Sequence, residues 1–404
     1  MSQRPLGFGI WGTGMIAEFH AKALAEIAGV KLVAAYNRSP AKGRDFAAKH
    51  GITFAETPEA LLANPDVDIV CLCTPSGDHL APALACAKAG KHVVVEKPLE
   101  VTLARCDELT SACAKAGVTV AGILPRRFGS GAVALKAALE AGRFGKLTLA
   151  AALIPWWRTQ AYYDSAAWRG TFALDGGGAV MNQGIHTIDL LLWFLGAPKR
   201  VSATAGLVAH DGIEVEDIAT GWIEFANGCR ATLASSTACW SATGFPAEIR
   251  IHGTTGAAVL RDDKLTAFEF EKPLPSDSSV LAPATEGGGA GANDPKAIGH
   301  AWHRSNLEEA IAAIRAGKQP AVNGAEGRKA VELASVARQP LANSIQPAAT
   351  SSTSMPSWAT RPAVAETRFG APRNQRSRSM VWIPWFMTAP PPSRANVPRQ
   401  AAES

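Results

Sequence analysis

The sequence predicts an α/β fold in two parts: an N-terminal domain with a doubly wound parallel sheet, and a C-terminal α+β domain with a mostly antiparallel sheet. Over about the first 120 residues, short apolar runs alternate with helical patterns. After Arg127 the strand-like runs instead alternate apolar and polar residues. With 404 residues, 47% of them hydrophobic, the chain is long and apolar enough to bury a core in each domain.

The N-terminal domain is predicted over residues 1–123. Its strand-like runs are rich in β-branched residues and almost continuously apolar, as expected for strands buried on both faces. The helical patterns between them are rich in Ala, Leu and Lys, and several end in Gly, as a helix C-cap would. The predicted strands are 6–12, 30–37, 67–74, 92–98 and 118–124, and the predicted helices are 16–27, 42–51, 81–90 and 103–117.

The C-terminal domain is predicted over residues 124–340, with helices packed on one face of its sheet. Turn signals at AHDG, ANG and HGTTG divide its alternating runs between 199 and 270. The predicted helices are 131–145, 176–196, 302–317 and one that starts at 324, with a strand over 146–157. The Gly- and Ala-rich segment 285–294 is predicted to be a mobile loop.

Residues 341–404 differ in composition from the rest of the chain. They are dominated by Ser, Pro, Ala, Arg and Gln, and WIPWFM is their one apolar island. Such a segment buries too little apolar surface to offset its ordering entropy, so we expect it to be largely disordered. The abrupt change in composition indicates a shifted reading frame or a fused downstream segment.

Composition and charge argue against several classes of protein. The net charge of +5 comes from scattered basic residues with no run interleaved with aromatics, so we expect no nucleic-acid partner. The seven cysteines are odd in number and lack the paired spacing of a zinc site, which favours a reducing cytoplasm and no metal. The sequence shows no signal-peptide pattern and no apolar run of about 20 residues, so we expect no membrane association.

A glycine-rich turn follows the first predicted strand and opens a helix. Gly12 permits the tight turn, Gly14 lets the backbone approach a pyrophosphate, and Ala17 allows the helix to pack closely on the strand. The helix N-terminus then attracts the phosphate charge. This context predicts dinucleotide binding through Gly12, Gly14, Met15 and Ile16.

The end of the second predicted strand indicates which dinucleotide binds. An NAD-specific fold usually places an acidic residue there, whereas this chain has Asn37, Arg38 and Ser39. A neutral Asn removes the repulsion against a 2′-phosphate, while a guanidinium and a hydroxyl can hold that group. We therefore favour NADP over NAD. The alternative is a surface loop whose Asn37 still bonds the ribose of NAD.

Further polar residues stand at or just after two later strand ends, where open α/β sheets bind their ligands. This position predicts that Lys97 points into the cofactor crevice. The cofactor-binding residues predicted here are Thr74, Pro75, His79, Glu96 and Lys97.

A polar and aromatic set is predicted to bind substrate. The apolar helix 176–196 carries Asn182, His186 and Asp189, and oxidation of a carbinol needs both a tunable acid/base and a cation to hold the oxygen. For Asp189 we favour a supporting role, either orienting the His186 imidazole or making a helix-packing bond. Aromatic rings with polar groups at their edges suit the faces and hydroxyl groups of a carbohydrate. Two arginines that face the pocket would suit an acidic sugar or nucleotide sugar. The predicted substrate-binding residues are Lys97, Arg127, Trp157, Arg158, Tyr163, Trp168, Arg169, Asn182 and His186; the aromatic members could equally form interdomain core.

The motifs GTGMIA, CTPSGDH, VVVEKP and DGGGAVMNQGIHTIDLLLWFLG together resemble the glucose–fructose oxidoreductase, inositol dehydrogenase and MocA (Gfo/Idh/MocA) family of nicotinamide-dependent sugar and polyol oxidoreductases. The resemblance covers about residues 5–338. It implies a Rossmann domain followed by a domain with an open, mostly antiparallel sheet, whose face often serves a homo-oligomer such as a dimer or tetramer. It also implies that Lys97 and His186 act at the reacting carbon, with Asn182 as the third catalytic-site residue where relatives most often have Asp.

Two other functions remain open from the sequence. An NAD-using glycosidase can be built on the same fold, although such relatives usually lack the Lys that stands here as Lys97. A non-catalytic dinucleotide-binding regulatory protein is the other alternative, which the retained Lys97 and His186 disfavour and Asn182 leaves open.

Overall fold

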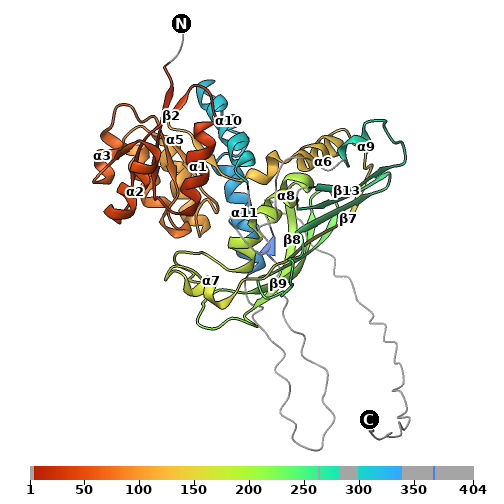
Figure 1. The fold of residues 1–404 in the computed structure, drawn as a ribbon. Helices are drawn as coiled ribbons and strands as arrows, with labels where there is room; N and C mark the ends of the chain where they lie inside the picture. Colours follow the sequence, from red (N-terminus) through yellow and green to blue (C-terminus); the bar gives the residue numbers. More distant parts are fainter. Residues whose placement is uncertain (1–3, 263, 282–298, 339–366, 369–404) are drawn as a thin grey trace, which may run out of the picture. The chain divides into compact units, whose positions relative to one another are not determined.

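The computed structural model describes residues 4–262, 264–281, 299–338 and 367–368 (Figure 1). The predicted mobile loop at 285–294 lies outside the described residues. The predicted disordered segment 341–404 also lies outside them, except for the two residues of β14 (Thr367–Arg368). No helix in the described part of the chain is long and apolar enough to span a bilayer.

The first sheet has six strands in the order β3-β2-β1-β4-β5-β6, and all neighbouring pairs are parallel. The strand order reverses beside β1, which creates the crevice where doubly wound sheets bind dinucleotides. The predicted doubly wound sheet is therefore confirmed. Its strands are β1 (Leu6–Trp11), β2 (Val30–Tyr36), β3 (Thr53–Phe54), β4 (Ile69–Leu72), β5 (His92–Val95) and β6 (Val120–Gly122). The helices between them are α1 (Met15–Ala25), α2 (Pro40–His50), α3 (Pro58–Ala63), α4 (Leu80–Lys88) and α5 (Leu103–Lys115).

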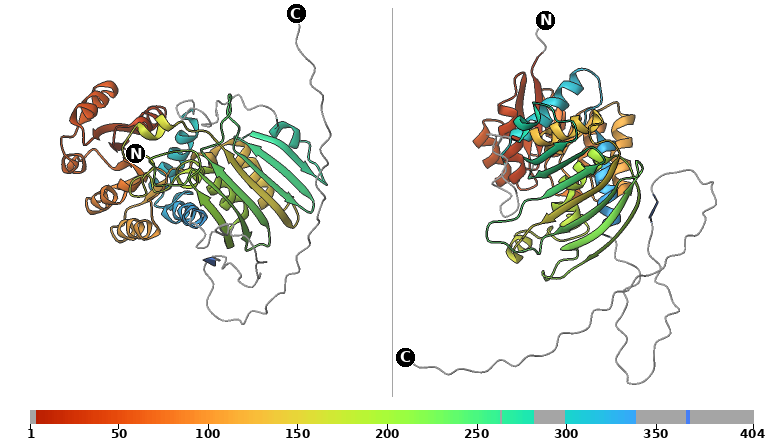
Figure 2. Two further views of the ribbon diagram at one scale, coloured as in Figure 1. Left: turned by 90° about the horizontal axis from the view of Figure 1, so that it is seen from below. Right: turned by 90° about the vertical axis from the view of Figure 1, so that its right-hand side faces the viewer.

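The second sheet has the order β13-β12-β11-β7-β10-β9-β8-β14. Its strands pair antiparallel except for β7 with β10, so the predicted mostly antiparallel sheet is confirmed. Figure 2 shows its long strands side by side. They are β7 (Leu147–Pro155), β8 (Pro198–Gly206), β9 (Ile218–Phe225), β10 (Arg230–Ser236), β11 (Glu248–Gly253), β12 (Gly256–Arg261) and β13 (Lys264–Phe270).

The two faces of this sheet differ in composition. Ala150, Ala231 and Ile223 are paired across three strands and buried beneath helices, because their side chains point to the same face. That face contacts α6 (Ser130–Glu140), α8 (Ile185–Leu195) and α11 (Gly324–Ala337). The opposite face exposes Leu149 and Trp222 among polar side chains.

The C-terminal helices return to the first sheet. Leu307 and Ile311 of α10 (Ala301–Arg315) belong to the same buried cluster as Phe8 of β1, and α10 contacts α1 (Figure 1). Asn306 of α10 accepts a hydrogen bond from the Leu124 backbone at 2.9 Å. The first sheet thus takes part of its cover from outside residues 1–123, and the division at 123/124 stays a prediction.

The predicted helix 176–196 is divided into two elements. A π-helical turn, η3 (Ala179–Gln183), precedes α8, and Gly184 donates to the Ala179 carbonyl at 2.8 Å. The Ser235 hydroxyl donates to the same carbonyl at 2.7 Å, and a side chain on Gly184 would collide with that hydroxyl. At the start of the turn, Glu216 accepts from the backbone of both Gly178 and Val180 at 3.0 Å. These contacts come from β10 and from the loop before β9, so local propensity does not reveal the π-helical turn that they stabilise.

Candidate functional site

The glycine turn between β1 and α1 fits a pyrophosphate. Gly12 has φ +96°, and a Cβ there would lie 2.8 Å from the Cys73 carbonyl oxygen, so only glycine lets β1 and β4 approach this closely. A Cβ on Gly14 would meet only open space. Gly14 begins α1 without a side-chain cap, so Met15 and Ile16 follow directly at the helix N-terminus, which suits an anion.

Asn37 fastens the end of β2 to the glycine turn. Its side-chain amide donates to the Thr13 hydroxyl, and its Oδ1 accepts from the Ser39 backbone at 3.1 Å. Arg38 is exposed at the same place, as is Lys42 of α2. The exposed charges at this edge are therefore basic, and Asn37 holds the loop that presents them.

Two predicted cofactor residues, His79 and Glu96, make buried hydrogen bonds within the protein. The ring nitrogens of buried His79 lie 3.0 and 3.2 Å from the carbonyl oxygens of Pro98 and Thr74, and burial lowers its pKa. Buried Glu96 bonds His20 at 2.7 Å; burial would raise the Glu96 pKa, but His20, His303 and Lys97 together lower it. The His79 ring and the Glu96 carboxylate thus support the strand ends behind Lys97, and their contacts with the cofactor stay predictions. Thr74 likewise bonds within its loop, to the Asp78 carbonyl at 3.0 Å, and Pro75 leads into that turn.

Lys97 meets the π-helical turn. Its Nζ donates to the Asn182 carbonyl at 2.9 Å and lies 3.3 Å from Asn182 Oδ1. Burial lowers the pKa of Lys97, and the positive charges of Arg169 and Arg158 act in the same direction. A small cavity lined by Lys97, Leu124 and Ile185, among others, lies beside it.

His186 is the second residue of α8 and carries a strongly perturbed imidazole. Burial, followed by the positive charge of Lys97 and Arg126, holds its pKa well below the usual range. Its Nδ1 has no hydrogen-bond partner among the described residues. A neutral imidazole in this position can accept a proton at neutral pH. The structure therefore brings Lys97, Asn182 and His186 together.

An arginine and aromatic cluster lies next to Asn182. Arg158 donates to Gln183 Oε1 at 2.7 Å, and Gln183 donates to the Tyr162 hydroxyl at 3.0 Å. Arg169 donates to the same hydroxyl at 2.5 Å and stacks over the rings of Tyr162 and Trp168. This cluster joins Arg158, Trp168 and Arg169 of the predicted substrate set.

For two predicted aromatic contacts the structure brings the neighbouring residue to the cluster. Tyr163 is buried with its hydroxyl 2.8 Å from Thr237, whereas Tyr162 bonds Arg169 and Gln183, so the substrate contact of Tyr163 stays a prediction. Trp157 pairs with the backbone of Ala238, whereas the guanidinium groups of Arg126 and Arg158 lie 5.6 and 5.3 Å from the Trp156 ring. Even-numbered residues of β7 face the helices, so the strand alternation could have indicated Trp156.

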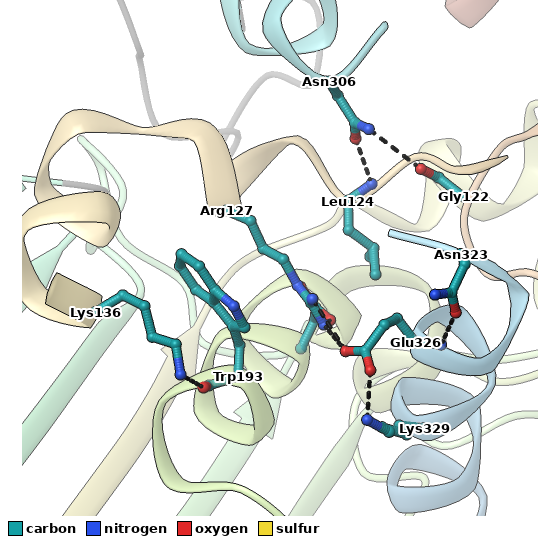
Figure 3. A network of polar contacts seen from close by, with 10 residues as sticks. Gly122, Leu124, Arg127, Lys136, Trp193, Asn306, Asn323, Glu326 and Lys329 are labelled. Atoms are coloured by element: carbon teal, nitrogen blue, oxygen red, sulfur yellow. Dashed lines mark hydrogen bonds and ion pairs between the residues drawn. The ribbon is translucent and has the colours of Figure 1, made fainter. Parts of the chain in front are cut away.

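Arg127 joins three elements through ion pairs, and its contact with substrate stays a prediction. It donates two hydrogen bonds to Asp189 at 2.6 and 2.8 Å. Its Nη2 also donates to Glu326 at 3.0 Å (Figure 3). These ion pairs join η2 (Pro125–Phe128) to α8 and α11. Asp189 thus makes a helix-packing bond. The arginine whose positive charge helps to lower the His186 pKa is Arg126, which the sequence analysis did not select.

Within the described ranges, no group of three His, Cys, Asp or Glu side chains is arranged to hold a metal ion.

Comparisons with known proteins agree with this geometry. Residues 6–122 match the model of the oxidoreductase family with an NAD-binding Rossmann fold, and residues 132–259 match the GFO/IDH/MocA C-terminal domain. The chain is 27% identical to inositol 2-dehydrogenase of Rhizobium meliloti, over 84% of this chain and 98% of that protein.

Two solved structures cover most of the chain. The WlbA dehydrogenase from Bordetella pertussis, in complex with NADH and UDP-GlcNAcA, has a TM-score of 0.75 and 28% identity over 84% of this chain and 95% of that chain. The WlbA dehydrogenase from Chromobacterium violaceum, with the same ligands, has a TM-score of 0.73 and 30% identity over 84% of this chain and 94% of that chain.

Proposed function

Because the chain belongs to the Gfo/Idh/MocA family of NAD-binding oxidoreductases, we propose that it transfers hydride between a nicotinamide cofactor and a carbinol or carbonyl carbon of an acidic sugar derivative. A uronic acid, free or as a nucleotide sugar, is the substrate class we favour. The observation that carries this proposal is the convergence of Lys97 and a neutral His186 beside Arg158 and Arg169.

The residues at the crevice fit a dinucleotide. The open space at Gly14 and the uncapped start of α1 suit its pyrophosphate, and Gly12 gives the turn its shape. Bound nicotinamide supplies the hydride acceptor or donor. The exposed Arg38 beside Asn37 favours NADP, because it offers a 2′-phosphate a cationic partner.

Lys97 and His186 have different roles at the reacting carbon: Lys97 binds the substrate oxygen, and His186 transfers the proton. The Lys97 ammonium holds the substrate oxygen and stabilises the negative charge that develops on it. The His186 imidazole, kept neutral by burial and by Lys97, accepts the hydroxyl proton during oxidation and returns it during reduction. Asn182 accepts a hydrogen bond from Lys97 and can also bond a sugar hydroxyl.

The charge balance around Lys97 favours an anionic substrate. Arg126 lies near His186, while Arg158 and Arg169 act on Lys97, and Arg158 is almost fully buried. A guanidinium in such a setting pairs strongly with a carboxylate because little water screens the interaction. Trp156 Nε1 is buried without a partner among the described residues and offers a further donor.

Pairs of substrates test the proposal. Nicotinamide absorbance is followed with glucuronic and galacturonic acids, free and as UDP derivatives, each against its neutral parent sugar. We expect kcat/KM for the acid to exceed that for the parent by about tenfold or more, as one charged contact would give. Arg158→Gln should remove most of this preference, with Arg44→Gln, an exposed guanidinium distant in sequence, as its control. Equal rates for acid and parent sugars would contradict the acidic class, and no turnover with any pair would support a non-catalytic protein.

Cofactor preference is tested through Arg38. Arg38→Ala should weaken NADPH binding by about tenfold, the value of one charge-assisted contact, while leaving NADH binding nearly unchanged. Equal losses for the two dinucleotides would contradict the NADP preference.

We also propose that the chain forms a homo-oligomer through the uncovered face of the second sheet. That face carries Leu149, Leu153 and Trp222, which are 53%, 46% and 42% exposed. Light scattering of the wild type should give the mass of a dimer or tetramer, and Trp222→Lys should reduce it. A monomeric wild type would contradict this proposal.

A further inference from the structure

Asn182 lies between Lys97 and a buried carboxylate that sequence reasoning did not select. Its side-chain Nδ2 donates to Asp175 Oδ1, while Lys97 Nζ donates to the Asn182 carbonyl at 2.9 Å and lies 3.3 Å from its Oδ1. Asp175 is 1% exposed, and its second oxygen accepts from the Gly170 backbone at 2.9 Å. The three side chains form a chain of contacts from the carboxylate to the ammonium.

The contacts fix which way the Asn182 amide faces. A carboxylate only accepts hydrogen bonds, so the NH2 group must face Asp175 and Oδ1 must face Lys97. Gln183 Nε2 also lies 3.3 Å from Asn182 Oδ1, which agrees with this orientation. Asp175 therefore turns the acceptor end of Asn182 toward Lys97.

We propose that Asp175 is a positioning residue: acting through Asn182, it orients the Lys97 ammonium and supplies the negative charge that keeps it protonated. The proposal rests on the proposed function only in assigning Lys97 to the reacting oxygen. It also explains why an amide stands at position 182. A carboxylate there would meet Asp175 directly, and two such groups would have to share a proton.

The charges around Lys97 make Asp175 important. Arg158, Arg169 and the nearby His186 are cationic or become so on protonation. Glu96 is the other acidic group acting on Lys97, and it is already bonded to His20.

The pKa shifts agree with this arrangement. Burial lowers the Lys97 pKa, and Asp175 together with Glu96 opposes that shift. Burial raises the Asp175 pKa, while Gly170, Asn182, Lys97 and Arg169 favour the charged carboxylate. Burial raises the pKa of both Tyr162 and Tyr163, and the charge of Asp175 acts in the same direction.

The test measures the Lys97 pKa without any substrate. Full-length protein is acetylated with trace acetic anhydride across a pH series, and mass spectrometry gives the reactivity of the Lys97 peptide. Asp175→Asn should lower the Lys97 pKa by about one pH unit, the lower end of the effect of an opposite charge at this range. Glu214→Gln is the matched control, because Glu214 bonds the Phe172 backbone at 2.8 Å and holds the same loop.

A reciprocal exchange makes the test specific. The double variant Asp175→Asn with Asn182→Asp restores one carboxylate and one amide, so the Lys97 pKa should return to the wild-type value or rise above it. An unchanged Lys97 pKa in Asp175→Asn, or an equal fall in Glu214→Gln, would overturn the proposal. If Asp175→Asn does not fold, Asn182→Ala decides: it removes the amide that links Asp175 to the Lys97 ammonium, so the Lys97 pKa should fall, and no change would overturn the proposal.

These outcomes separate the inference from the function. A chain that shows the expected Lys97 shifts but oxidises no sugar would contradict the proposed function and leave the role of Asp175 intact.

Discussion

Replacing Arg127 with Met tests the buried ion-pair cluster that joins η2, α8 and α11. The side chains of Arg127 and Asp189 are 6% and 2% exposed, so the substitution leaves a carboxylate without its partner in a buried site. Breaking a buried pair in this way costs about 3–5 kcal/mol. We expect the free energy of unfolding to fall by that amount, with a Tm roughly 6–10 °C lower at about 2 °C per kcal/mol.

The matched double variant separates charge from packing. Arg127→Met with Asp189→Leu replaces the pair by apolar side chains of similar size, and this exchange should recover most of the loss. Urea unfolding and thermal melts of the wild type, the single variant and the double variant give the three values.

The pH dependence of Arg127→Met gives a second readout. Burial already raises the Asp189 pKa against the opposing effect of Arg127, so removing Arg127 raises it further. The folded variant then binds a proton that the unfolded chain releases, and its deficit relative to wild type should shrink as the pH falls from 7 toward 5. A loss under about 1 kcal/mol, or a double variant no more stable than the single one, would refute the reasoning.

Three further predictions follow from the site and its surroundings. Lys97→Met and His186→Gln should each lower kcat about 100-fold or more because each removes a positioned polar group; near-normal turnover of either variant would contradict its role. Tyr162→Phe should raise KM more than Tyr163→Phe does, since Tyr162 bonds Arg169 and Gln183; the reverse order in steady-state kinetics would favour the original prediction. Burial lowers the pKa of His303 from 6.5 to about 4, so it contributes stability above pH 6.5 that is lost as the pH falls toward 4, up to about 3 kcal/mol. His303→Asn should flatten the Tm dependence between pH 7 and 5, and an unchanged dependence would contradict the assignment.

The sequence predicted the elements whose pattern repeats over many residues. Buried parallel strands read as continuous apolar runs, and the glycine turn has a spacing set by the pyrophosphate, so β1, β4, β5 and Gly12 could be placed correctly. The position of Lys97 could also be predicted, because residues just after a parallel strand lie at the edge of the sheet where ligands bind.

Single-residue choices in turns could not be made from the sequence. Arg126 and Arg127 lie in a short 3₁₀ helix, and Tyr162 and Tyr163 lie in a five-residue helix, so tertiary contacts decide which neighbour faces the site. Asp175 escaped selection for a similar reason. Its importance arises from the π-helical turn that brings Asn182 against it, and that turn depends on contacts from Ser235 and Glu216.

The most direct test of the central claim is nicotinamide-linked turnover of the acid and neutral sugar pairs by the wild type, Lys97→Met and His186→Gln, with dinucleotide binding measured in parallel. The account predicts that the wild type turns over the acids faster than the neutral sugars and that both variants lose this turnover. The dinucleotide should still bind all three proteins. Acid turnover that survives both substitutions would contradict the claim that Lys97 and His186 carry out the chemistry.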